Sequence, residues 1–211
     1  MKFRRKSAEL AESEAADAAA AAEVEPTPGP YDVDDLPAGD DAQRVDLGSL
    51  LIEPSPDLEL RLQVDESTDQ VQAVLLAGAD GAIELRAFAA PRGGDLWSEI
   101  RPKIAADYAQ RGGTATEREG RFGTELVCAL TVKAPDGRTG TQPSRVIGIN
   151  GERWMLRATL LGRPAAEIDS AGAWEDAIER VVVRRGAHAM AVGDELPLTL
   201  PPQDQLVVRD A

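Results

Sequence analysis

The sequence predicts an α+β domain, in which a twisted antiparallel sheet of about six to seven strands is packed with two main helices. Three observations lead to this fold class. Apolar and polar residues alternate with a period of two along several stretches. Short turns rich in glycine, proline, asparagine and aspartate join these stretches, and two longer segments space their apolar residues by three and four. Strands joined by short hairpins are antiparallel, whereas a parallel sheet needs a crossover between almost every pair.

The first part of the sheet is predicted over residues 58–89. In residues 58–65 and 83–89 every second side chain is apolar, and residues 71–77 form a further strand between them. The cluster Gly78-Ala79-Asp80-Gly81 is typical of a turn. We therefore expect residues 71–89 to form a β-hairpin.

A helix is predicted next, with Asp95 or Ser98 as its N-cap. Gly112-Gly113 marks its end. Pro102 removes one helical hydrogen bond, so the helix should begin near Ser98 or be kinked. Its apolar stripe consists of Trp97, Ile100, Ile104 and Tyr108.

The second part of the sheet follows this helix. Asn150-Gly151 between apolar runs is a strong hairpin signal and joins the last two strands. A polar loop is expected through Thr141 and Pro143. The predicted strands are residues 114–119, 125–133, 145–149 and 152–161.

A second helix is predicted from Asp169 or Ser170 to Arg184-Arg185-Gly186, with Trp174, Ile178, Val181 and Val182 on one stripe. Trp97 and Trp174 should anchor the two helices against the sheet. The proline-rich residues 196–202 must be extended.

Charge and composition divide the chain into three parts. Residues 1–41 are predicted to be a disordered, acidic, alanine-rich tail, because they carry a net charge of −7 and no apolar stripe. Residues 42–202 should form a single α+β domain, and residues 203–211 a disordered end. Acidic residues interrupt every apolar stretch that could serve as a signal peptide, and no stretch is long enough to cross a membrane, so we expect a cytoplasmic protein.

The net charge of −14 argues against binding to nucleic acid or to anionic membranes. A single Cys and a single His exclude a disulfide and a Cys/His zinc site within one chain. Phosphate-binding glycine loops and a serine-hydrolase elbow are missing as well. We expect no cofactor, no metal and no catalytic residue, with Cys128 buried and His188 in an exposed loop.

Alternation predicts a candidate binding face made by Arg86, Phe88, Arg153, Met155 and Arg157. Arginines beside aromatic and thioether groups suit an acidic or carboxylate-bearing protein partner. Alternatively, these arginines pair with Glu84, Glu125 and Glu152 on a solvated face.

A second candidate element is a docking motif of Tyr31, Val33 and Leu36 among acidic residues, which would suit a basic groove on a partner. The alternative interpretation is a solvated linker whose Tyr31 and Leu36 touch the edge of the domain.

Six segments that occur in order along the chain carry a resemblance to a known family: Pro30–Asp35, Val45–Leu51, Ala89–Arg92, Leu96-Trp97, Gly151–Arg157 and Leu196–Pro201. Together they resemble an actinobacterial family known as domain of unknown function 3710. The resemblance spans residues 30–202 and implies no catalytic residues. The order of strands and helices is also similar to the fold of the Mog1 and photosystem II P-protein superfamily, which implies a non-enzymatic accessory or binding role.

These observations favour a non-enzymatic binding or regulatory module. The alternative is a hydrolase or other enzyme that acts on a small anionic substrate through carboxylates and Arg, without Cys or His. The sequence leaves the oligomeric state open.

Overall fold

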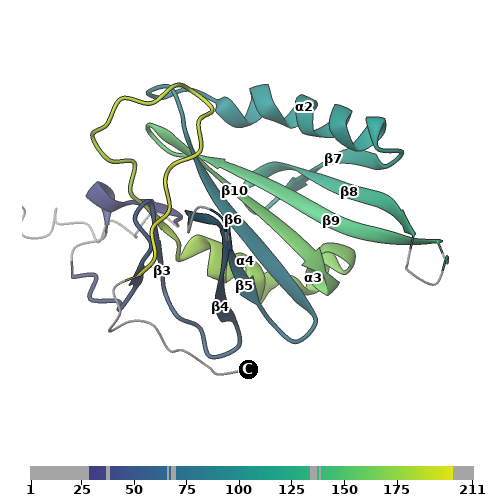
Figure 1. Cartoon of the computed structure of the whole chain (residues 1–211), viewed down its shortest axis with the longest axis horizontal. Helices are drawn as coiled ribbons and strands as arrows, with labels where there is room; N and C mark the ends of the chain where they lie inside the picture. The colour runs from purple at the N-terminus through teal and green to yellow at the C-terminus, as the bar shows by residue number, and fades with distance from the viewer. Residues whose placement is uncertain are drawn as a thin grey trace, which may run out of the picture.

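Seven antiparallel strands form the main sheet of the computed structural model, which describes residues 29–36, 39–65, 67, 70–133, 137 and 139–201 (Figure 1). Their spatial order is β4-β5-β6-β10-β9-β8-β7, so β4 and β7 are the edges. The predicted fold class is confirmed. The strands are β4 (Glu59–Asp65), β5 (Gln70–Ala77), β6 (Gly81–Ala89), β7 (Thr114–Gly120), β8 (Gly123–Lys133), β9 (Thr139–Asn150) and β10 (Trp154–Gly162).

Both predicted hairpins are present, and one turn differs. β5 pairs with β6, and β9 pairs with β10 from Ser144 onward. The turn of the second hairpin includes Glu152 and Arg153, which the sequence analysis assigns to the strand. β10 therefore begins two residues later, at Trp154.

The expected loop through Thr141 and Pro143 is a strand instead, because β9 already begins at Thr139. Pro143 pairs with Ala129 of β8, whereas β10 pairs with β9 only from Ser144 onward. Proline is tolerated in a strand where one side has no partner. Pro143 lies in such a one-sided stretch, so the proline does not end the strand.

The helix α2 (Leu96–Gln110) packs on one face of the sheet, over β7, β8 and β9. Its N-cap is Asp95, whose side chain accepts a hydrogen bond from the backbone N–H of Ser98. The helix thus begins before Ser98 and contains Pro102. Trp97 anchors it as predicted, since this side chain is buried in the apolar cluster between α2 and the sheet and donates to the carbonyl of Thr124 at 2.6 Å.

The other face is covered by α3 (Arg163–Ala166), η2 (Ile168–Ser170) and α4 (Gly172–Glu179), together with a second small sheet. Figure 1 shows α2 and α4 on opposite sides of the main sheet. The apolar side chains between this face of the sheet and these elements form the larger of the two cores in the described part of the protein. Trp174 packs against this larger core. The small sheet has the order β1-β11-β3-β2 and consists of β1 (Tyr31–Asp32), β2 (Val45–Asp46), β3 (Leu50–Ile52) and β11 (Val182–Val183).

The second helix is shorter than predicted. α4 ends at Glu179, and Val182–Val183 form β11, the strand between β1 and β3. Three consecutive valines at 181–183 are β-branched and lose side-chain freedom in a helix, so they favour a strand. Pairing on both sides of β11 adds hydrogen bonds that a longer helix would lack.

The described structure begins at Gly29. Tyr31 and Asp32 pair with β11, and η1 (Val33–Asp35) follows directly. Tyr31–Asp35 fall within the tail predicted over residues 1–41, whereas in the structure Tyr31 and Asp32 belong to the small sheet and Val33–Asp35 form η1. Residues 1–28 and 202–211 lie outside the described residues, so the disorder expected there stays a prediction.

The segment Asp194–Thr199, here called the C-terminal strap, overlaps the predicted extended residues 196–202 and forms isolated β-bridges at Glu195 and Leu198. It runs beside β6, where Leu196 N–H donates to the carbonyl of Ala87 and Ala89 N–H donates to that of Asp194, both at 2.8 Å. Leu196 is buried in the larger core. The strap therefore borders the end of β6 on the side away from β10.

A buried ion pair crosses the larger core. Arg145 of β9 is 1 % exposed and donates from Nε and Nη2 to the two carboxylate oxygens of Glu125 on β8, at 2.8 and 2.7 Å. Nη2 also contacts Glu175 of α4. Arg121 bonds Asp176 and Glu179 of the same helix. Arginines on the sheet side thus bind all three acidic residues of α4.

We predict that Arg145→Met lowers the free energy of unfolding by about 3–5 kcal/mol, because the variant leaves buried carboxylates without a counter-ion. Arg61 pairs with Glu59 but is 63 % exposed, so Arg61→Met is the matched control and should cost no more than about 1 kcal/mol. Chemical denaturation checks both values. Equal costs would show that the buried pair is not needed for stability.

Gly148 of β9 lies directly under the indole of Trp97, and a Cβ at this position would overlap the ring. We predict that Gly148→Ala costs about 1–3 kcal/mol through this overlap. Gly172 at the start of α4 has open space around its Cβ position. Gly172→Ala is the control and should be neutral or stabilise by up to about 1 kcal/mol. A Gly148→Ala variant as stable as the wild type in thermal denaturation contradicts this packing.

Candidate functional site

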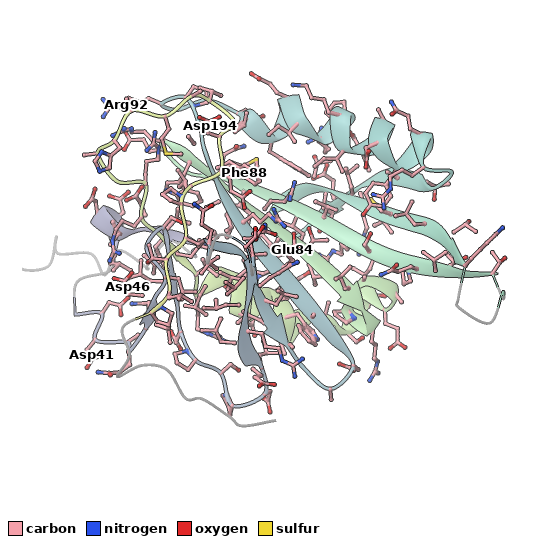
Figure 2. All side chains as sticks on the ribbon, in the orientation of Figure 1. Asp41, Asp46, Glu84, Phe88, Arg92 and Asp194 are labelled. Atoms are coloured by element: carbon pink, nitrogen blue, oxygen red, sulfur yellow. The ribbon has the colours of Figure 1, made fainter. Side chains whose placement is uncertain are left out.

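Two strands at the centre of the main sheet carry the candidate site. In the register of β6 and β10, Arg86 lies opposite Arg157, and Phe88 lies opposite Met155. Directly opposed residues share one face of a sheet, and Phe88 and Met155 belong to the apolar cluster beneath α2. Figure 2 shows Glu84 and Phe88 on β6, with the strap on one side and α2 on the other. We call Arg86, Phe88 and Arg157 the arginine site.

Arg86 is held by two carboxylates. Its Nε donates to Glu84 Oε1 at 2.8 Å, and its Nη1 lies 3.4 Å from Glu195 Oε2 on the strap. The Arg86 side chain is 26 % exposed. The second contact is at the long end of the hydrogen-bond range, so Glu195 holds Arg86 only weakly.

Arg157 has the more unusual environment. Its side chain is 25 % exposed, yet its guanidinium donates no hydrogen bond to any residue that the structure describes. The nearest carboxylate is Glu84, 3.9 Å from Nη2, and the guanidinium lies 5.1 Å from the centre of the Phe88 ring. Burial, and then the positive charge of Arg86, lower the pKa of Arg157. A guanidinium remains protonated despite such a shift.

Two predicted members of the binding face do not belong to it. Met155 is fully buried against α2 and is therefore inaccessible to a partner. Arg153 lies in the turn before β10, because the turn takes up two residues that the prediction gives to the strand. Arg86, Phe88 and Arg157 are brought together as predicted.

The alternative pairing with glutamates is correct for one of its three members. Glu84 pairs with Arg86, whereas Glu125 pairs with the buried Arg145, and Glu152 pairs with Arg92 at 3.3 Å. Glu195 is the carboxylate that the sequence reasoning missed. Glu195 lies in the strap, which runs beside β6. No local pattern in the sequence indicates that the strap lies next to this strand.

A pocket of about 460 Å³ adjoins Arg86. Its walls combine the side chains of Gln70 and Gln72 with the strap. Gln72 Nε2 already donates to Asp65 at 2.9 Å, and Glu195 adds a carboxylate, so this pocket combines hydrogen-bond donors and acceptors beside the arginine site. The residues around it are Gln70, Val71, Gln72, Arg86 and Glu195–Leu198.

The predicted docking motif lies elsewhere on the molecule. Tyr31 is in β1, Val33 is the first residue of η1, and Leu36 follows η1, all three half-buried. Asp32 accepts a hydrogen bond from Trp154 Nε1 at 2.8 Å, which fixes this segment to the domain. The segment is therefore a folded corner, and its role in docking stays a prediction.

Other chemistry-bearing groups are enclosed or dispersed. Glu125 is completely buried with Arg145, so this carboxylate is inaccessible to a substrate. His188 is in an exposed loop, as expected. Within the described ranges, no three His, Cys, Asp or Glu side chains are grouped so that they could hold a metal ion. The described helices include none with both the length and the apolar character needed to cross a membrane.

Cys128 is 2 % exposed, in agreement with its predicted register, and burial raises its pKa to about 11. We predict that a thiol reagent labels the folded protein slowly at pH 8, because only about one thiol in a thousand is then a thiolate. Labelling should accelerate sharply in denaturant. Immediate stoichiometric labelling of the native protein would contradict both the burial and the raised pKa.

Neither the curated proteins nor the solved structures that were compared contain a significant match to this chain. The likeness to the Mog1 and photosystem II P-protein fold therefore stays a prediction. A family model matches residues 29–206, which include the whole described fold, the acidic corner and the arginine site. The chain belongs to the family described as "Protein of unknown function (DUF3710)".

Proposed function

We propose that this protein is a non-enzymatic binding module of the cytoplasm, and that its arginine site receives a carboxylate of an acidic protein partner. The observation that supports this proposal is the guanidinium of Arg157, which is three-quarters buried and has no hydrogen-bond acceptor among the described residues. A guanidinium carries five N–H donors in a fixed plane. A carboxylate from a partner supplies two acceptors in matching geometry.

The surroundings of Arg157 strengthen such a contact. The ring of Phe88 and the partial burial of the site reduce the water around the guanidinium, which raises the strength of an ion pair. Arg86 directly opposite adds a second positive charge, and two like charges on paired strands repel each other. Glu84 and Glu195 offset these two charges in part, through contacts of 3.4 to 3.9 Å at Glu195 and at Arg157, and an incoming carboxylate reduces the remaining repulsion.

The overall charge favours a carboxylate within a compact partner over a nucleic acid. The chain has a net charge of −14, which repels an extended phosphate backbone at long range. A single carboxylate does not bring a row of further negative charges onto this surface. The specific contact and the long-range repulsion together select a short acidic segment of a protein.

The test compares Arg86→Gln/Arg157→Gln with the wild type in binding a fluorescently labelled peptide of alternating glutamate and leucine. Fluorescence anisotropy should show at least about tenfold weaker binding for the variant, because each charge-assisted hydrogen bond contributes about 1.5–3 kcal/mol. Arg61→Gln/Arg92→Gln is the matched control. These two arginines are 63 % and 77 % exposed and lie outside the site, so their loss should leave the affinity unchanged.

Thermal denaturation of the same variants separates binding from stability. Partly exposed ion pairs contribute about 0–1 kcal/mol each, so the melting temperature of Arg86→Gln/Arg157→Gln should move by only a few degrees. Affinity equal to that of the wild type refutes the site. Loss of the fold in this variant would show instead that the two arginines serve stability.

A further inference from the structure

Two unpaired carboxylates project from the small sheet. Asp34 and Asp35 of η1 are exposed, and neither side chain has a hydrogen bond or ion pair with a described residue. Half-buried Val33 and Leu36 lie on either side of them. We call residues Val33–Leu36 the acidic corner.

The acidic corner is held in a fixed shape. Tyr31 N–H donates to the carbonyl of Val181 at 3.0 Å, which ties the preceding strand to β11. The side chain of Asp32 caps η1 by accepting from the N–H of Asp34 at 3.1 Å, and it also accepts from Trp154. A prearranged pair of carboxylates loses little conformational entropy when it binds.

The acidic corner complements the arginine site in charge and in character. One surface presents two carboxylates beside apolar side chains, and the other presents two guanidinium groups beside Phe88. The acidic corner has no cation among the described residues, and Arg157 donates no hydrogen bond to a described residue and has Glu84 only at 3.9 Å. A contact between them would give the partly buried Arg157 two further acceptors.

Within one molecule the two surfaces cannot meet. Asp32 reaches the main sheet through Trp154, whose side chain lies in the larger core, on the face that α4 covers. The arginine site lies on the opposite face, with α2. A contact between the acidic corner and the arginine site therefore joins two molecules.

We infer that the acidic corner of one copy of this chain docks onto the arginine site of a second copy. This inference rests on the proposed function of that site and names its partner. The contact joins two different surfaces, so a bound pair leaves one acidic corner and one arginine site free. Association then continues head to tail, and its extent rises with protein concentration.

The experiment uses the full-length chain in sedimentation equilibrium at about 0.15 M ionic strength, where charges more than about 8 Å apart are largely screened. The wild type should show an average mass that rises with concentration between about 10 μM and 1 mM, as expected for a small interface. The variant Asp34→Asn/Asp35→Asn removes the two negative charges of the acidic corner. The variant Arg86→Gln/Arg157→Gln removes the two positive charges of the arginine site. Each variant alone should remain a monomer.

A mixture of the two variants is the decisive measurement. The arginine variant retains an acidic corner and the aspartate variant retains an arginine site, so the mixture can form one contact and no second one. We expect a species of twice the monomer mass that does not grow further at higher concentration. Asp57→Asn/Glu99→Gln removes two other exposed acids and should associate like the wild type.

Several outcomes overturn the inference. A wild type that stays monomeric up to 1 mM refutes the contact between copies, and if it still binds the acidic peptide through Arg86 and Arg157, the proposed function stands with a different protein as partner. Association that persists in either variant places the interface elsewhere. If the arginine variant fails to fold, unchanged association of the aspartate variant, whose substitutions are on the surface, suffices to refute the inference.

Discussion

The contact of Arg145 with Glu125 and Glu175 fixes the position of α4, and the larger core depends on that position. α4 is only eight residues long and is too short to be stable alone. Its acidic side chains bind Arg145 and Arg121 on the sheet side, while Trp174 and Ile178 pack into the apolar core. The chain then turns directly into β11, which pairs with β1 and β3. The small sheet is therefore placed by the helix that the ion pairs hold.

Local patterns in the sequence predict the main sheet well, because each strand and turn leaves its own signal over a few residues. Alternation gives β4, β6 and β8, and Asn150-Gly151 gives the central hairpin. The errors occur where the conformation of a segment depends on its pairing with a strand that is distant in the sequence. Val182 continues a helical stripe by spacing alone, but its pairing with residues 130 and more positions earlier in the chain makes it a strand. Pro143 is tolerated only because β10 stops pairing at Ser144.

The candidate site shows the same limit. Alternation places Arg86, Phe88 and Arg157 on one face, and the structure agrees. Alternation alone does not reveal that both faces of this sheet are covered, so it assigns Met155 to an open surface and treats Glu125 as solvated. Both are buried because α2 and α4 lie on opposite faces. Which face of the sheet a helix covers depends on tertiary contacts, and no single segment of the sequence indicates it.

Partial covering of the α2 face has a direct consequence for binding. α2 lies over β7, β8 and β9 and leaves the middle of the sheet to charged side chains and the strap. A charged group on a fully open surface would be well hydrated and would gain little from a partner, while a buried one such as Arg145 needs its counter-ion within the fold. Arg157 is between these limits, since one quarter of its side chain remains exposed and Glu84 is at 3.9 Å. This intermediate burial is the reason for proposing that Arg157 receives an external carboxylate, which is not needed for folding.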